Sequence, residues 1–144
     1  METDKPAAYP EPVTMPRPLV NRLLHHAQQG AGMEVCGLIA GRGGRPSRCI
    51  PVANISPSPA ARYEMDPKGQ IDAMRAMRER GEALFAIYHS HPSSPAEPSA
   101  TDLAQAAYPD TLYLIISLKT KGILELRGFL LEDRGFREVA LEFD

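Results

Sequence analysis

The stretch His89-Ser90-His91-Pro92, separated from Asp102 by ten residues, constrains this chain more than any other part of its sequence. The apolar run at 83–88 directly before it predicts a buried strand that ends at the histidines. Side chains two positions apart in a strand share one face of the sheet, so His89 and His91 project in the same direction. Ser90 points to the opposite face, where we expect it to orient the adjacent loop or a group behind the ligands. The pattern predicts a strand end that presents two imidazoles to one metal ion.

The residues after the histidines are expected to return Asp102 to the same place. Three prolines between residues 92 and 98 stiffen the connecting loop. Ser99 then has the position of a helix N-cap, and Asp102 that of the acidic third residue, in a helix predicted through residue 107. A helix cap alone would also explain these two residues. Their combination with the paired histidines and the stiff loop favours a metal site.

This donor set is typical of a catalytic zinc site. Three protein ligands leave one coordination position open for water, whereas structural zinc sites are closed by four ligands that usually include paired cysteines. No Cys-x-x-Cys pattern occurs in the chain. The sequence therefore predicts a hydrolase that binds one Zn2+ per chain through His89, His91 and Asp102.

A zinc hydrolase also needs a base for its water, and Glu34 is the leading candidate. It begins a predicted apolar strand at 34–41, which runs into the Gly-rich turn at 41–44, so it would lie at the rim of the sheet. Spacing alone leaves open the alternative of an ordinary exposed acid between a helix and a strand.

These residues together resemble the JAMM (MPN-plus) family of zinc metalloproteases and isopeptidases. The family signature is a distant Glu, then His-x-His, ten residues and Asp, with a Ser three residues before that Asp. The matching residues are Glu34, His89, His91, Ser99 and Asp102. The segments at 36–41 and 62–67 and the strand leading into Tyr88 are also similar, so the resemblance covers roughly residues 17–143.

The resemblance implies a fold and a role for each matching residue. The fold is α/β (α+β), a JAMM/MPN domain of the cytidine-deaminase-like kind, with a curved mixed β-sheet flanked by helices. His89, His91 and Asp102 would be the zinc ligands, and Glu34 would accept the proton of the water and deliver it to the leaving amine. Ser99 would donate its hydroxyl to the developing oxyanion.

The resemblance also implies a substrate class. Only a short segment separates the strand predicted at 46–53 from Arg62, which leaves little room for the insertions that grip ubiquitin in larger relatives. The chain therefore resembles a minimal prokaryotic member, which would cleave after the C-terminal Gly-Gly of a ubiquitin-like protein, including β-grasp sulfur carriers. Two alternatives stay open: a zinc hydrolase of small peptides or amides, and a non-catalytic scaffold that binds proteins. The sequence also leaves a homodimer open.

Length and composition agree with one compact domain. The chain has 144 residues, of which 43% are hydrophobic, enough for a single core without disulfides. Its net charge of −2 gives no basic surface for nucleic acid. No run approaches 18 apolar residues and no signal peptide is evident, so we expect a cytoplasmic protein that does not bind membranes. Residues 1–15 are rich in proline and polar residues and predict a disordered tail, which leaves 16–144 as the catalytic domain.

Other residues have plain structural interpretations. Cys36 and Cys49 would lie nearly opposite each other if the hairpin turned at 42–43; a disulfide is then one alternative, and two buried reduced thiols are the favoured one. His25 and His26 are adjacent in a helix predicted to end near residue 29, and are expected to be surface or packing residues. A further helix is predicted from 66 to 81, and strands at 111–118, 123–132 and 136–143.

Overall fold

The computed structural model describes residues 9, 11–119 and 125–144. Its elements, in chain order, are β1 (Val13–Met15), α1 (Arg17–Gln29), β2 (Cys36–Arg42), β3 (Arg45–Val52), α2 (Pro67–Glu79), β4 (Ala83–His91), α3 (Ala100–Gln105), β5 (Leu112–Ser117), β6 (Glu125–Glu132), β7 (Gly135–Val139) and β8 (Leu141–Phe143). Six strands form one sheet in the order β3-β2-β4-β5-β6-β7, and β1 pairs with β8.

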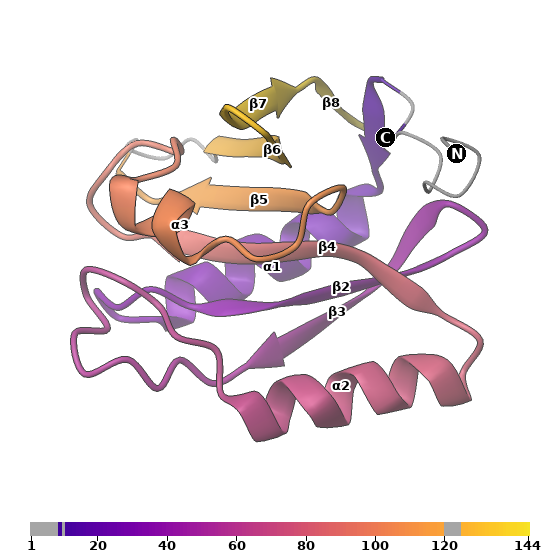
Figure 1. Cartoon of the computed structure of the whole chain (residues 1–144), viewed down its shortest axis with the longest axis horizontal. Coiled ribbons are helices and arrows are strands. Elements are labelled where there is room, and N and C mark those ends of the chain that lie inside the picture. The colour runs from indigo at the N-terminus through magenta and orange to yellow at the C-terminus, as the bar shows by residue number, and fades with distance from the viewer. Residues whose placement is uncertain (1–8, 10, 120–124) are drawn as a thin grey trace.

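The sheet is mixed because its two central strands run in the same direction. β4 and β5 pair in parallel, and the other neighbours in the sheet pair antiparallel. In Figure 1, α1 lies behind the sheet, and α2 and α3 lie on the side that faces the viewer. The predicted class, a mixed sheet flanked by helices, is therefore confirmed.

Alternation along the strands sends apolar side chains to both faces of the sheet. Ile39 and Tyr88 belong to the core beneath α1, and their chain neighbours Leu38 and Ile87 belong to the core beneath α2. This is the expected pattern for central strands that are covered on both sides. Burial on both faces holds β2 and β4 in one register, and these are the strands that carry or adjoin the predicted site residues.

The two long helices begin and end close to their predicted bounds. α1 buries Leu19, Val20, Leu23 and Ala27, whereas Leu24 is only partly buried. α2 begins after Asp66, whose side chain accepts a hydrogen bond from the backbone N–H of Lys68. α3 is shorter than predicted and ends at Gln105.

The prediction of a disordered tail is wrong for the residues that form β1. Val13 and Met15 are 2% and 0% exposed, and β1 pairs in parallel with β8. Before it, the Tyr9 hydroxyl donates to the carbonyl of Phe85 at 2.6 Å and accepts from the N–H of Leu112 at 3.1 Å. The ordered domain therefore begins before residue 16. The remainder of the predicted tail, residues 1–8 and 10, lies outside the described residues.

The hairpin between β2 and β3 turns one residue later than expected, at Gly43 and Gly44, which both have positive φ. Together with a bulge between Ala40 and Gly41, this turn places Cys36 opposite Val52 and Cys49 opposite Ile39. The two cysteines therefore do not face each other, and both are free and buried. The disulfide alternative is excluded, and the expectation of two buried thiols is confirmed.

The last predicted strand, 136–143, is in fact two strands that belong to different sheets. β7 completes the six-stranded sheet. The chain then leaves this sheet at Ala140, and the next residues form β8, which pairs with β1. The strand predicted at 123–132 is described from residue 125 on; residues 123 and 124 lie outside the described residues. None of the helices in the described part of the chain has the length and apolar character needed to cross a membrane.

A core substitution in β1 tests whether this strand belongs to the folded domain. Met15→Ala removes a fully buried side chain and should lower the free energy of unfolding by about 2–5 kcal/mol. The control Thr14→Ala changes the exposed neighbour in the same strand and should cost less than about 0.5 kcal/mol. Urea unfolding of both variants measures the difference. Equal stability of the two would show that β1 does not pack in solution.

Candidate metal centre and active site

The predicted histidines lie inside β4, which continues through His91. His89 pairs with Cys36 of β2 on one side and with Ile115 of β5 on the other, so it is held in the middle of the sheet. The side chains of His89 and His91 are 2% and 3% exposed. Their backbone positions are therefore set by the strands on both sides of β4.

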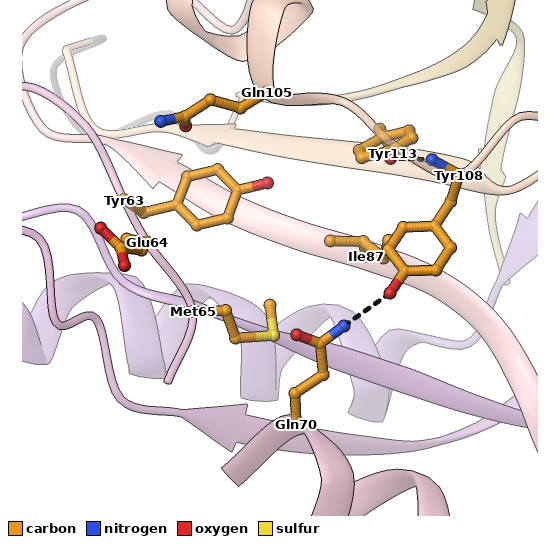
Figure 2. Close-up of a pocket in the computed structure, with 8 residues that line it drawn as sticks. All are labelled: Tyr63, Glu64, Met65, Gln70, Ile87, Gln105, Tyr108 and Tyr113. Atoms are coloured by element: carbon orange, nitrogen blue, oxygen red, sulfur yellow. Dashed lines mark hydrogen bonds between the residues drawn. The ribbon is translucent and has the colours of Figure 1, made fainter. Parts of the chain in front are cut away.

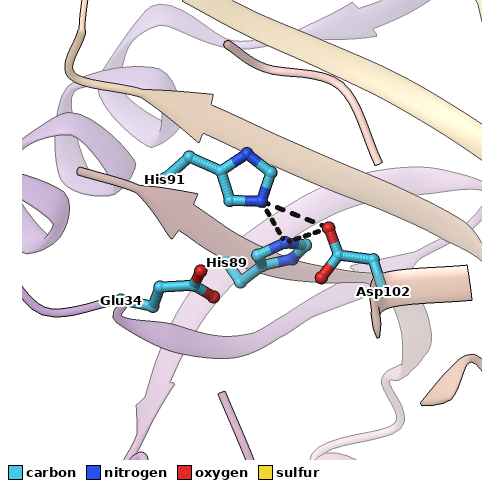
Figure 3. Close-up of side chains that lie close together, drawn as sticks. All are labelled: Glu34, His89, His91 and Asp102. Carbon is cyan, nitrogen blue, oxygen red and sulfur yellow. Dashed lines mark hydrogen bonds and ion pairs between the residues drawn. The ribbon is translucent and has the colours of Figure 1, made fainter. Parts of the chain in front are cut away.

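Three side-chain atoms meet at the end of β4, as Figure 3 shows. The Nε2 atoms of His89 and His91 are 3.1 Å apart, and each lies 3.2 Å from Oδ2 of Asp102. A tetrahedral zinc site with ligand distances of about 2.0–2.1 Å has its ligand atoms about 3.3–3.4 Å apart. The three atoms are thus close to the spacing that a shared zinc ion imposes.

The chemistry of the donor atoms also fits a cation. His91 donates its Nδ1–H to the carbonyl of Pro95 at 2.7 Å, so its neutral ring presents a lone pair at Nε2. That lone pair faces the carboxylate of Asp102 and the Nε2 atom of His89. Two or three acceptors in mutual contact are favourable only when a positive charge lies between them. The residues therefore fit a divalent metal.

In the absence of a metal, a proton takes over part of this bridging role. Burial opposes the charged form of His91, but its hydrogen bonds with Asp102 and Pro95 outweigh burial and raise its pKa. Burial alone would raise the pKa of Asp102, yet hydrogen bonds from His89 and His91 hold it well below its ordinary range. Burial lowers the pKa of His89, which favours the neutral, metal-binding form of that ring.

Asp102 reaches the histidines because α3 begins with the predicted capping box. The backbone N–H of Ser99 donates to Asp102 Oδ2 at 2.9 Å, and Ser99 Oγ accepts from the N–H of Asp102 at 3.0 Å. The oxygen that faces the histidines is thus also held by the backbone of Ser99. Since the Ser99 hydroxyl already accepts one bond, its hydrogen is free to donate to another group.

Glu34 lies beside the three predicted ligands rather than in solvent, so the alternative of an exposed acid is excluded. It is 6% exposed, and one of its carboxylate oxygens lies within 4.8 Å of the ligand atoms of the other three residues. It sits two residues before β2, which begins at Cys36. The sequence placed Glu34 at a sheet rim, and the structure adds its proximity to the histidines.

The backbone around Glu34 is held by hydrogen bonds on both sides. Its N–H donates to the carbonyl of Pro59 at 2.7 Å, and its carbonyl accepts from the side-chain amide of Asn54 at 2.9 Å. The next N–H, of Val35, donates to Ser90 Oγ at 2.9 Å. Ser90, predicted to orient a neighbouring loop, thus ties the Glu34 segment to the strand that carries the histidines.

Burial prepares the Glu34 carboxylate to exchange a proton near neutral pH. Burial raises the pKa of Glu34 from its ordinary value of 4.5 to about 7, although the charge of His91 opposes the shift. Its Oε1 atom is buried and has no hydrogen-bond partner among the described residues. A carboxylate with a pKa near the working pH is suited to general acid and base catalysis.

Tyr63 is a site residue that the sequence did not reveal as such. Its ring stacks on the imidazole of His89, with centroids 4.5 Å apart and planes 26° apart. Tyr63 also lines a cavity of about 320 Å³ next to the metal centre, shown in Figure 2. The cavity lies between residues 63–65, which form an irregular segment, and Tyr108 and Tyr113. The sequence predicts an extended strand at 62–65 beside the zinc; in the structure only Met65 of this segment forms a β-bridge, with Asn54.

Two residues outside the site agree with their expected structural roles. His25 is exposed, and Nδ1 of the partly buried His26 accepts a hydrogen bond from the Tyr88 hydroxyl at 2.7 Å. They lie on α1, behind the sheet, whereas the metal centre belongs to the other face. They therefore are packing and surface residues.

Comparison with known proteins identifies the family. The family described as prokaryotic homologs of the JAB domain matches residues 16–127 of the chain. The chain belongs to this family. It is similar to the CysO-cysteine peptidase of Mycobacterium tuberculosis (38% identity over 122 residues, 83% of each chain). It is also similar to the probable TtuB-protein conjugate cleaving protease of Thermus thermophilus (39% identity over 127 residues, 88% of this chain and 80% of the relative).

A solved structure agrees with the JAB assignment. The solution structure of a protein from Desulfitobacterium hafniense superposes with a TM-score of 0.82 at 35% identity, over 91% of this chain and 92% of that one. The resemblance to the JAMM family and the JAMM/MPN fold expected from the sequence are therefore confirmed. The similar JAB-domain proteins are peptidases, so the chain is a hydrolase of the JAMM type.

The raised pKa of Glu34 predicts how the stability of the metal-free protein depends on pH. Because the folded-state pKa of about 7 exceeds the ordinary 4.5, the folded state keeps a proton that the unfolded chain releases. The Glu34 carboxyl therefore lowers the free energy of unfolding progressively as pH rises from 4.5 to about 7. Above pH 7 this loss of stability stays constant. Glu34→Gln removes the ionisable group, so its stability advantage over the wild type should grow between pH 4.5 and 7.

Thermal unfolding of the metal-free wild type and Glu34→Gln, measured at intervals from pH 4 to 8, checks this expectation. Glu64→Gln is the matched control, because Glu64 is exposed. The melting temperature of Glu64→Gln should differ from that of the wild type by the same amount at every pH. A Glu34→Gln difference that does not change with pH would contradict the buried, raised-pKa state of this carboxyl.

Proposed function

We propose that this JAB-domain protein is a zinc-dependent peptidase that cleaves after the C-terminal Gly-Gly of a ubiquitin-like carrier protein of the β-grasp type. The observation that carries the proposal is the meeting of three ligand atoms, from His89, His91 and Asp102, beside the buried carboxylate of Glu34. Cytoplasmic location and one zinc ion per chain are parts of the same proposal.

His89, His91 and Asp102 would hold the zinc ion. Glu34 would transfer the proton, and Ser99 would donate a hydrogen bond to the oxyanion. When bound, Zn2+ polarises the scissile carbonyl and lowers the pKa of water to about 7. Glu34 accepts the proton of the attacking water and then donates it to the leaving amine. Its position next to the ligands and its pKa of about 7 suit both steps.

Ser99 supplies a hydrogen bond to the negative charge that develops on the carbonyl oxygen. Its hydroxyl accepts from the N–H of Asp102, which turns the hydroxyl hydrogen away from α3. The N-cap thus has two roles: it fixes Asp102 and it offers a donor at the edge of the metal centre. Loss of one such donor usually lowers kcat by about 100- to 1000-fold.

The cavity beside Tyr63 is the place that we propose for the carrier tail. It lies beside the candidate metal centre, because Tyr63 both lines it and stacks on His89. A Gly-Gly tail has no side chains to bind, so its recognition must depend on the backbone and on a narrow passage that a Cβ atom would block. Residues 63–65 line this cavity, and they are the segment that we propose for the backbone contacts.

Similarity to named relatives supports a carrier as substrate. One relative is a peptidase for CysO-cysteine, and the other is a probable protease for conjugates of TtuB. Both names describe cleavage at a protein partner rather than hydrolysis of free peptides. A non-catalytic scaffold would not need the complete set of ligands and base, so we do not favour it.

Substitutions can separate the ligands from the base. His91→Ala removes a ligand and should abolish zinc binding and peptidase activity together, since the remaining two ligands hold the ion weakly. Glu34→Gln keeps the shape of the side chain but cannot accept a proton, so zinc should stay bound while kcat falls by about 100-fold or more. Elemental analysis and turnover measurements on both proteins check this. Stoichiometric zinc in His91→Ala, or full activity in Glu34→Gln, would overturn the assignment.

Variation of the carrier tail tests the substrate class. A β-grasp carrier extended after its Gly-Gly should be cleaved at that position, and replacement of the final Gly by Val should abolish cleavage because the added side chain clashes in the passage. Mass spectrometry of the products identifies the bond that is cut. A control carrier with Val placed several residues before the Gly-Gly should be cleaved normally. Equal cleavage of both Val carriers, or equally fast cleavage of short unrelated peptides, would favour small substrates instead.

A further inference from the structure

We infer that Tyr63 is a positioning residue, which holds the ring of His89 in the orientation that binds the metal. The inference rests on the proposed zinc site. Tyr63 is not one of the signature residues and is not part of the capping box. The argument for its role begins with a difference between His89 and His91.

The two histidine ligands are held in different ways. A histidine that binds a metal usually donates its other ring N–H to a carbonyl or carboxylate, which fixes the orientation of the ring. His91 follows this rule through its Nδ1–H and the carbonyl of Pro95. The Nδ1 atom of His89 is buried and has no hydrogen-bond partner among the described residues. His89 therefore needs a different support.

Tyr63 supplies this support through the face of its ring. The two rings are nearly parallel, at 26°, with centroids 4.5 Å apart, which is the geometry of a favourable aromatic stack. On another side, the ring of His91 approaches His89 edge-on, with centroids 4.9 Å apart and planes 65° apart. Rotation of the His89 ring would break the stack with Tyr63. The stack thus takes the place of the hydrogen bond that fixes His91.

Tyr63 can act as a support because its own backbone is anchored on both sides. The side chain of Asn54 accepts a hydrogen bond from the N–H of Glu64 at 2.9 Å and donates one to the carbonyl of Arg62 at 3.2 Å. The same amide group also donates to the carbonyl of Glu34. One side chain therefore ties the two neighbours of Tyr63 to the segment of the proposed base.

The stack depends on the aromatic ring and not on the hydroxyl group. Among the described residues, the Tyr63 hydroxyl makes no hydrogen bond that would hold the ring, and Figure 2 shows Tyr63 among the residues that line the cavity. A phenylalanine at this position would keep the stack, whereas an aliphatic side chain would fill the space without a planar face. The two substitutions therefore separate stacking from both hydrogen bonding and simple space filling.

The test measures zinc affinity by competition with a chromophoric chelator, for the wild type and three variants. Tyr63→Leu should bind zinc about 10-fold more weakly, the lower end of what loss of a supporting residue costs a metal site. Tyr63→Phe should stay within about two-fold of the wild type, because the stacked ring is kept. Tyr108→Leu is the matched control: Tyr108 lines the same cavity, but its hydroxyl accepts a hydrogen bond from Gln70, and its replacement should leave zinc affinity unchanged.

A second measurement reports the geometry of the site rather than its affinity. With Co2+ in place of Zn2+, the visible absorption of Tyr63→Leu should differ from that of the wild type, and Tyr63→Phe should match it. If Tyr63→Leu does not fold, as judged by thermal unfolding, Tyr63→Met serves in its place.

The outcomes distinguish this inference from the proposed function. Wild-type affinity and spectrum in Tyr63→Leu would overturn the inference and leave the zinc site standing. A loss in Tyr63→Phe equal to that in Tyr63→Leu would also overturn it, since the hydroxyl would then be the essential group. A wild-type protein that binds no zinc would instead overturn the proposed zinc site itself.

Discussion

The parallel pairing of β4 with β5, next to the antiparallel pairing of β4 with β2, is the constraint on which the rest of the structure depends. It places β4 in the middle of the sheet, with a packed core on each face. A slip of one residue would exchange the side chains packed in the two cores and would move His89 and His91 to the face beneath α1. The register of β4 therefore determines the face to which the side chains of His89 and His91 point and the spacing between them.

The metal centre gathers groups that would destabilise the fold if they were left without partners. Buried imidazoles and carboxylates are costly unless they are hydrogen-bonded or bind a metal. Here the cost is reduced in several ways: the backbone of α3 holds Asp102, the Pro95 carbonyl holds His91, and an aromatic ring covers His89. Glu34 has the least compensation, and its pKa of about 7 reflects this. The chain keeps an unfavourable buried carboxyl beside the candidate metal ligands.

The sequence predicted those parts of the site whose signals are local. The apolar run before His89 and the capping box of Ser99 and Asp102 each lie within a few residues, so their structures could be derived from periodicity and helix-cap chemistry. The proximity of Glu34 could not be derived in that way, because it depends on the contact between Val35 and Ser90, 55 residues apart. Only resemblance to a known family gave Glu34 its role.

Other features could not be predicted either, because they depend on the hairpin register or on contacts between residues that lie apart in the sequence. Val13–Met15 is too short for a pattern of its own and becomes a strand only by pairing with the other end of the chain. Cys36 and Cys49 do not face each other because the turn lies one residue later than expected and a bulge between Ala40 and Gly41 shifts the register further. The stacking of Tyr63 depends on the path of an irregular segment, which the side chain of Asn54 sets.

The bond between Val35 and Ser90 has one more consequence. Ser90 also donates its backbone N–H to the carbonyl of Val35 at 3.0 Å, so the alignment of β2 beside β4 continues past the end of β2 and places Glu34 beside the histidines. The position of the Glu34 backbone relative to the histidines is therefore set by the same strand alignment that sets the spacing of the two histidines, and by the hydroxyl of Ser90.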